Sequence, residues 1–120
     1  MKKIEIFERA IAEKAANLKD YNINGTLFWA YRECEQTGNE HINFSEVIWE
    51  KEIEEIANSM KEYGITEFTI SSTFSGLIST LAEFEKHGIK MQGLTEVKER
   101  YKNIFTGERD MIPAIRMTVE

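Results

Sequence analysis

The 120-residue sequence contains one cysteine, Cys34, one proline, Pro113, and two histidines. A single cysteine cannot form an intrachain disulfide, which excludes a secreted scaffold built on such bridges. The longest apolar runs, such as residues 27–31, fall far short of the ~20 residues that a membrane helix needs. The mixed-charge start, residues 1–9, lacks the apolar segment of a signal peptide. These absences predict a soluble cytoplasmic protein without membrane contact.

Metal ligands and nucleophiles are also scarce. His41 and His87 lie 46 positions apart, and neither has a His or Cys partner at metal-ligand spacing. Helical spacing with Leu27 and Tyr31 predicts that Cys34 is a buried, inert thiol, since a nucleophile would need a histidine beside it. We therefore expect no metal, no cofactor and no identifiable catalytic residue, and enzyme activity is left open with non-enzymatic action favoured.

The chain has fewer basic than acidic residues, and its net charge is −6. Residues 1–63 hold 8 Lys/Arg against 13 Asp/Glu, so the acidity lies in the N-terminal half. Nucleic-acid binding depends on Lys and Arg that displace counterions from phosphates, and an acidic surface opposes it. A modest basic patch of Lys98, Arg100 and Arg116, diluted by Glu96, lacks interleaved aromatic residues. Nucleic acid is therefore an unlikely partner.

The N-terminal half shows three helical patterns. The first spans about residues 3–19, and the second runs from about residue 26 to Thr37, with Gly38 as its stop. Residues 26–31 also have high strand propensity, so a short buried strand is an alternative there. A third helix is predicted to begin at Asn43–Glu46, which fits a capping box, and to end at Gly64. Its apolar stripe includes Trp49 and Ile53.

The C-terminal half reads as strand, helix, strand, strand. The expected strands are residues 67–70, 89–101 and 110–119, and a helix opens at residues 71–73 and stops at Gly88. Gly93 suggests a bulge, and Pro113 suggests an edge strand or another bulge. The fold class is α/β (α+β): N-terminal helices pack on one face of a small mixed three-stranded sheet that carries a C-terminal β-α-β-β unit. Residues 1–120 form one domain.

A strand-to-helix junction is the candidate ligand site. Free backbone N–H groups and a positive helix end point outward at such a junction, and hydroxyl groups add donors for an anion or phosphate. The alternative is that Ser72 or Thr73 simply caps the helix. There is no Walker lysine and no GxGxxG pattern. The candidate residues are Ser71, Ser72, Thr73, Ser75 and Gly76.

Trp29 is the candidate contact residue. If residues 26–31 are helical, Trp29 lies away from Leu27 and Tyr31 and near Arg32. Aromatic residues together with Arg are typical interface anchors. A second buried face against a neighbouring helix would explain Trp29 equally well.

Several segments resemble a known family. Residues 24–32, the helix from Phe44 to Ala57, residues 63–74 and Gly93–Val97 resemble small uncharacterised proteins of Firmicutes, often encoded on mobile elements. That family has no assigned activity and implies an intact domain without catalytic residues. Residues 74–93 also resemble the late helix and strand of GNAT-type acetyltransferases. The glycine-rich pyrophosphate loop of that fold is absent, and helices occupy the N-terminal half where it needs strands.

Two functional hypotheses follow. The first is a non-enzymatic accessory or regulatory protein that acts through protein contacts, including a homodimer formed at the sheet edge or at the Trp29 surface. The second is a small enzyme or binding domain for an anionic metabolite at the junction of residues 71–76.

Overall fold

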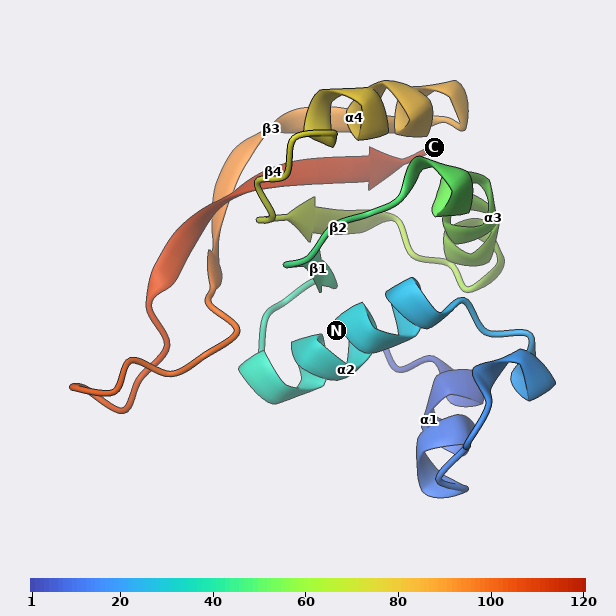
Figure 1. The fold of residues 1–120 in the computed structure, drawn as a ribbon, viewed down its shortest axis with the longest axis horizontal. Coiled ribbons are helices and arrows are strands. Elements are labelled where there is room, and N and C mark those ends of the chain that lie inside the picture. Colours follow the sequence, from blue (N-terminus) through green and yellow to red (C-terminus); the bar gives the residue numbers. More distant parts are fainter.

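Four strands form one mixed sheet in the computed structural model, which describes residues 1–120 (Figure 1). Their order is β1-β2-β4-β3; β1 is parallel to β2, and β4 is antiparallel to both of its neighbours. The α+β class is confirmed, but the sheet has four strands instead of three. The elements along the chain are α1 (Glu5–Ala12), η1 (Leu18–Tyr21), α2 (Gly25–Thr37), β1 (Asn43–Phe44), η2 (Glu50–Glu52), α3 (Ile53–Glu62), β2 (Glu67–Ile70), α4 (Leu77–Lys86), β3 (Ile89–Lys98) and β4 (Met111–Val119).

The additional strand, β1, lies where a helix start was expected. The Asn43 amide does not cap a helix; its Oδ1 accepts a hydrogen bond from Thr69 Oγ1 at 2.7 Å, and its Nδ2 donates to Ser71 Oγ at 2.9 Å. Phe44 packs edge-on against Phe68, with ring centroids 5.5 Å apart. These partners lie on β2 and just after it, so tertiary contacts override the local capping signal. The third helix therefore begins only at Ile53, after η2.

The first helix is shorter than expected. It ends at Ala12, and Lys14 takes a left-handed backbone conformation with φ of +50°. The Ala15 N–H donates back to the Ala10 carbonyl, which closes the helix end. Residues 18–21 then form the separate turn η1, so the predicted range of 3–19 was wrong at its C-terminal end.

The second helix is confirmed, and the strand alternative for residues 26–31 is excluded. Asn24 caps it, because its side-chain oxygen accepts a hydrogen bond from the Leu27 N–H at 2.9 Å. Gly38, in the left-handed conformation, ends it. Leu27, Tyr31 and Cys34 are buried along one side, as their spacing predicted.

Strand β4 lies between β2 and β3, so the expected edge position of the proline strand was wrong. β2 pairs only with residues 115–118 of β4, whereas β3 pairs with residues 111–119. At Pro113 β4 therefore has a neighbour on one side only, which is where a residue without an N–H is tolerated. The bulge at Gly93 is confirmed by the register shift between Met91 and Gly93.

The bulge determines which side chains share a face of the β3–β4 hairpin. Met91 pairs with Met117 and Leu94 pairs with Ile115. Met91 and Leu94 therefore lie on the same face, although an odd-numbered and an even-numbered residue of a regular strand would point to opposite faces. α4 contacts β3, but Leu94 on this face is 80 % exposed. On the opposite face, Val97 and Ala114 are buried near the other end of the hairpin.

The hairpin end is attached to the segment after α2. The Asn39 side chain donates to the Lys98 carbonyl at 3.1 Å and accepts from the Lys98 N–H at 2.8 Å. The long hairpin therefore curves away from α4, and its loop projects beyond α2 (Figure 1).

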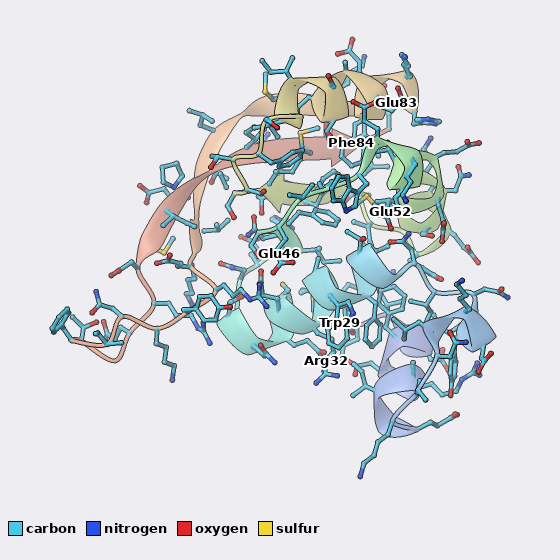
Figure 2. The ribbon with its side chains drawn as sticks, in the orientation of Figure 1. Trp29, Arg32, Glu46, Glu52, Glu83 and Phe84 are labelled. Atoms are coloured by element: carbon cyan, nitrogen blue, oxygen red, sulfur yellow. The ribbon has the colours of Figure 1, made fainter.

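A single apolar cluster connects these elements and includes residues from Ile4 to Met117. Phe84 points from α4 toward the sheet, where its ring lies 5.5 Å from that of Phe68 (Figure 2). Phe7 attaches α1 through edge-on contacts with Phe28 and Tyr31. None of the helices combines the length and the apolar character required to cross a membrane.

Candidate functional site

A cleft of about 570 Å³ lies between α2 and the segment from β1 to η2. Trp29 of α2 and Trp49, just before η2, both line it, and they are 64 % and 59 % exposed. The cleft also includes Arg32 and Val47. We call this surface the tryptophan cleft; Figure 2 shows Trp29 and Arg32 on α2, with Glu46 and Glu52 on the opposite wall.

Local structure explains why both indoles are exposed. α2 buries Phe28 and Tyr31 in the core, whereas Trp29 is mostly exposed and packs edge-on against Phe28, with ring centroids 5.5 Å apart. Trp49 has an extended backbone immediately before η2 and therefore does not follow the helical stripe that sequence spacing suggested. The next apolar residue of that stripe, Ile53, is fully buried.

Three carboxylates in the tryptophan cleft already have partners. Arg100 reaches into it from the end of the β3–β4 hairpin, where its Nε lies 3.2 Å from Glu33 Oε1 and its Nη1 contacts Glu46. The hydrogen bond with Glu46 raises the pKa of Arg100. Ser45 Oγ donates to Glu33 at 2.8 Å, and Thr26 Oγ1 lies 3.1 Å from both carboxylate oxygens of Glu52. These contacts hold the walls in place.

Arg32 differs from Arg100, because its guanidinium makes no ion pair or side-chain hydrogen bond within the chain. It lines the tryptophan cleft and also a second cleft, between the α1–η1 region and α2, which is lined by Phe28 and Lys14 as well. Trp29 is shared by the two clefts in the same way. The predicted pair of Trp29 and Arg32 therefore lies on one accessible surface.

Trp49 is the residue that sequence reasoning missed. It was assigned to the buried stripe of a helix that was expected to begin at Asn43 and instead begins at Ile53. The run Glu50–Glu52 that follows it consists of good helix formers, so the sequence gives no local signal for a break at this point.

The predicted anion site lies elsewhere, between β2 and α4. The Ser71 and Ser72 N–H groups both donate to the Phe44 carbonyl, and the Ser71 hydroxyl accepts from Asn43. α4 begins at Leu77, not at residues 71–73, and Gly76 is its N-cap without a side-chain cap. Residues 71–76 do not line either cleft described above. The structure does not test anion binding at this junction, which stays a prediction.

Cys34 has a structural environment. Its thiol is buried and lies 3.2 Å from the carbonyl oxygens of Asn39 and His41, to which it donates. Burial raises the pKa of Cys34 to about 11, so the reactive thiolate is scarce at neutral pH. No group of three or more His, Cys, Asp and Glu side chains is arranged to hold a metal ion.

Comparison with known proteins identifies a family. No curated protein and no solved structure matches the chain. Residues 26–119 match the model of a family described as "Domain of unknown function (DUF7698)", and this range runs from the first turn of α2 to the end of β4. Apart from Gly25, it contains every residue that lines the tryptophan cleft. The expected relation to a family without an assigned activity is confirmed, whereas its link to Firmicutes and mobile elements stays a prediction. The chain belongs to the DUF7698 family.

Proposed function

We propose that this protein is a non-enzymatic accessory or regulatory protein that acts by binding a protein partner through the tryptophan cleft. One observation carries the proposal: Trp29 and Trp49, from separate elements, are both more than half exposed and line the same cleft. Large apolar side chains that gather at an exposed concave surface are typical of interaction sites.

The chemistry of the tryptophan cleft fits a protein ligand. Trp and Arg are enriched among the residues that dominate binding energy, and an indole supplies a large contact area with little conformational entropy to lose. Trp29 and Trp49 provide two such rings, and Arg32 provides a cation without an internal partner. Because Glu33 and Glu46 are already bound to Arg100, the partner meets a prearranged wall.

The proposal is tested by photo-crosslinking from inside the cleft. Val47 lines the cleft, is 39 % exposed, and is a suitable position for a photoreactive residue. Ile78, on α4, is 82 % exposed and outside the cleft, and is the matched control position. We expect a discrete polypeptide adduct from position 47 in cells, and none of that mass from position 78.

The tryptophans provide the second half of this test. Trp29→Ala with Trp49→Ala should abolish the adduct from position 47 while the far-ultraviolet circular dichroism is retained, since both side chains are mostly exposed. No polypeptide adduct from position 47, or an adduct that survives the double substitution in a folded chain, would refute the proposal.

A further inference from the structure

β3 is the outermost strand of the sheet, because the strand order places β4 on one side of it and no strand on the other (Figure 1). The opposite edge strand, β1, has two residues, whereas β3 has ten. A long edge strand offers unpaired N–H and C=O groups to another extended chain. β3 is therefore the edge of this sheet at which a further strand can be added.

The hydrogen bonds at Lys98 show which residues of β3 turn their backbone groups outward. Both the N–H and the C=O of Lys98 bond with the Asn39 side chain, which lies between α2 and β1, so Lys98 faces away from β4. This orientation alternates along a strand, and the pairing of residues 93–98 with β4 is continuous. Glu96 and Leu94 therefore face outward in the same way as Lys98.

The Asn39 side chain already pairs with this edge as a neighbouring strand would. It supplies one donor to the Lys98 carbonyl at 3.1 Å and one acceptor to the Lys98 N–H at 2.8 Å, the exchange that paired residues of antiparallel strands make. The backbone groups of Glu96 and Leu94 bond with no side chain and with no loop. The outer edge is thus occupied at Lys98 and open at Glu96 and Leu94.

The side chains of the two open residues define the chemistry of a strand that fits beside them. Leu94 and Glu96 are two positions apart in one strand, so both side chains lie on the same face of the sheet. Leu94 is mostly exposed, and Glu96 is exposed and has no ion-pair partner in the chain. Apolar pairs and opposite charges are favourable between directly opposite residues of paired strands. An added strand therefore fits best with an apolar residue opposite Leu94 and a basic residue opposite Glu96.

We propose that the outer edge of β3 binds an extended segment of a partner protein that pairs antiparallel with residues 94–96. Along this segment a basic residue, one intervening residue and an apolar residue follow in that order, which places the basic residue opposite Glu96 and the apolar residue opposite Leu94. The occupied groups of Lys98 limit the segment on one side, and the bulge at Gly93 limits it on the other. Neither Leu94 nor Glu96 lines the tryptophan cleft, so this is a second interaction surface.

A second copy of this chain fits the same edge poorly. When two β3 strands pair antiparallel about a twofold axis, the register that uses the groups of both open residues puts Leu94 opposite Glu96 of the other copy. Each carboxylate then lies opposite a leucine side chain and gains no cation. The segment is therefore assigned to a different protein.

Nuclear magnetic resonance of the isotope-labelled full chain tests this site. The probe is a blocked peptide, Thr-Lys-Thr-Val-Thr, and its control is the same peptide with a methylated valine nitrogen, which removes a donor to β3. At millimolar concentration the first peptide should shift the amide signals of Leu94 and Glu96 and slow their hydrogen exchange. The methylated peptide should do neither. Equal shifts with both peptides, or no shift at either residue, would overturn the proposal.

A charge reversal tests the basic residue of the segment. Glu96→Lys should weaken binding of the lysine peptide about twofold to fivefold and should strengthen binding of the peptide with glutamate in place of lysine. Glu85 on α4 is exposed and has no ion-pair partner, so Glu85→Lys is the matched control. It should leave the ratio of the two dissociation constants unchanged. An equal change of this ratio in both variants would overturn the assignment to Glu96.

Two further outcomes would identify a different occupant. A peptide that shifts only the indole signals of Trp29 and Trp49 binds in the tryptophan cleft, which would overturn the β3 site and leave the proposed function standing. A chain that dimerises with rising concentration and becomes monomeric with Leu94→Pro, which removes an outward N–H, pairs β3 with itself. That result would overturn the assignment to a different protein, again without touching the proposed function.

Discussion

Arg100 and Glu33 join the end of the β3–β4 hairpin to α2, with Arg100 Nε 3.2 Å from Glu33 Oε1. The two residues are 67 positions apart in the sequence, yet this contact brings the hairpin to the rim of the tryptophan cleft. The Glu33 side chain is only 13 % exposed, which distinguishes this pair from a freely solvated one.

Arg100→Ala should therefore loosen the hairpin. We expect a loss of about 0.5–1 kcal/mol in the free energy of unfolding, the range for partly exposed ion pairs, and faster amide hydrogen exchange in residues 99–110. Urea unfolding and exchange mass spectrometry measure the two effects. Lys51→Ala, an exposed lysine without a partner, is the control. Unchanged exchange in the hairpin would show that the contact does not hold it.

Gly93→Ala tests the bulge in β3. Gly93 has φ of +131°, a conformation that side-chain-bearing residues rarely adopt, although a Cβ there would meet no atom within 4 Å. The cost is therefore backbone strain alone, about 1–3 kcal/mol. Gly25→Ala is the matched control, because Gly25 lacks a positive φ and its Cβ would also meet open space. Thermal unfolding should show a lower melting temperature for Gly93→Ala only.

Glu8→Gln should make stability less dependent on acid pH. The Tyr31 hydroxyl donates to Glu8 Oε1 at 2.8 Å, and this hydrogen bond lowers the pKa of Glu8 in the folded chain. A carboxylate whose folded pKa lies below its unfolded value stabilises the protein above the unfolded pKa. That contribution is lost as the pH falls through the folded pKa.

The variant should thus be less stable than the wild type at neutral pH, and the difference should shrink on acidification. Urea unfolding at a series of pH values from neutral to acidic measures this difference in the free energy of unfolding. Glu5→Gln removes the same charge from α1 without affecting the Tyr31 contact and is the control. A difference between Glu8→Gln and wild type that is constant with pH would contradict the assignment.

The junction of residues 71–76 is the predicted anion site, and the hydroxyls of Ser72 and Thr73 permit a direct test. Inorganic phosphate, nucleotides and acyl-CoA are the probes, because a ligand that binds only the folded chain raises its melting temperature. If the junction binds an anion, one of these probes should stabilise the wild type and not the chain with Ser72→Ala and Thr73→Ala. Equal melting shifts in both proteins would reject the site.

Local features were readable from the sequence wherever one residue and its near neighbours decide the backbone. The end of α2 at the left-handed Gly38 and the bulge at Gly93 are of this kind. The capping signal at Asn43 failed because its amide has partners on and after β2, 26 and 28 positions away. Residue type indicated that Trp29 and Arg32 could be contact residues. The sequence could not show that Trp49 would join them.

The sequence by itself determined the order strand, helix, strand, strand in the C-terminal half and the burial of Cys34, because periodicity and glycine conformation are local properties. It did not determine that α4 begins only at Leu77 or that β3 ends at Lys98. Only the tertiary structure decided that β4 inserts between β2 and β3, and that Arg100 from the hairpin reaches the cleft between α2 and the β1–η2 segment. Both depend on pairings between residues far apart in the chain. Their free energy comes from the assembled core and has no signature in any short stretch of sequence.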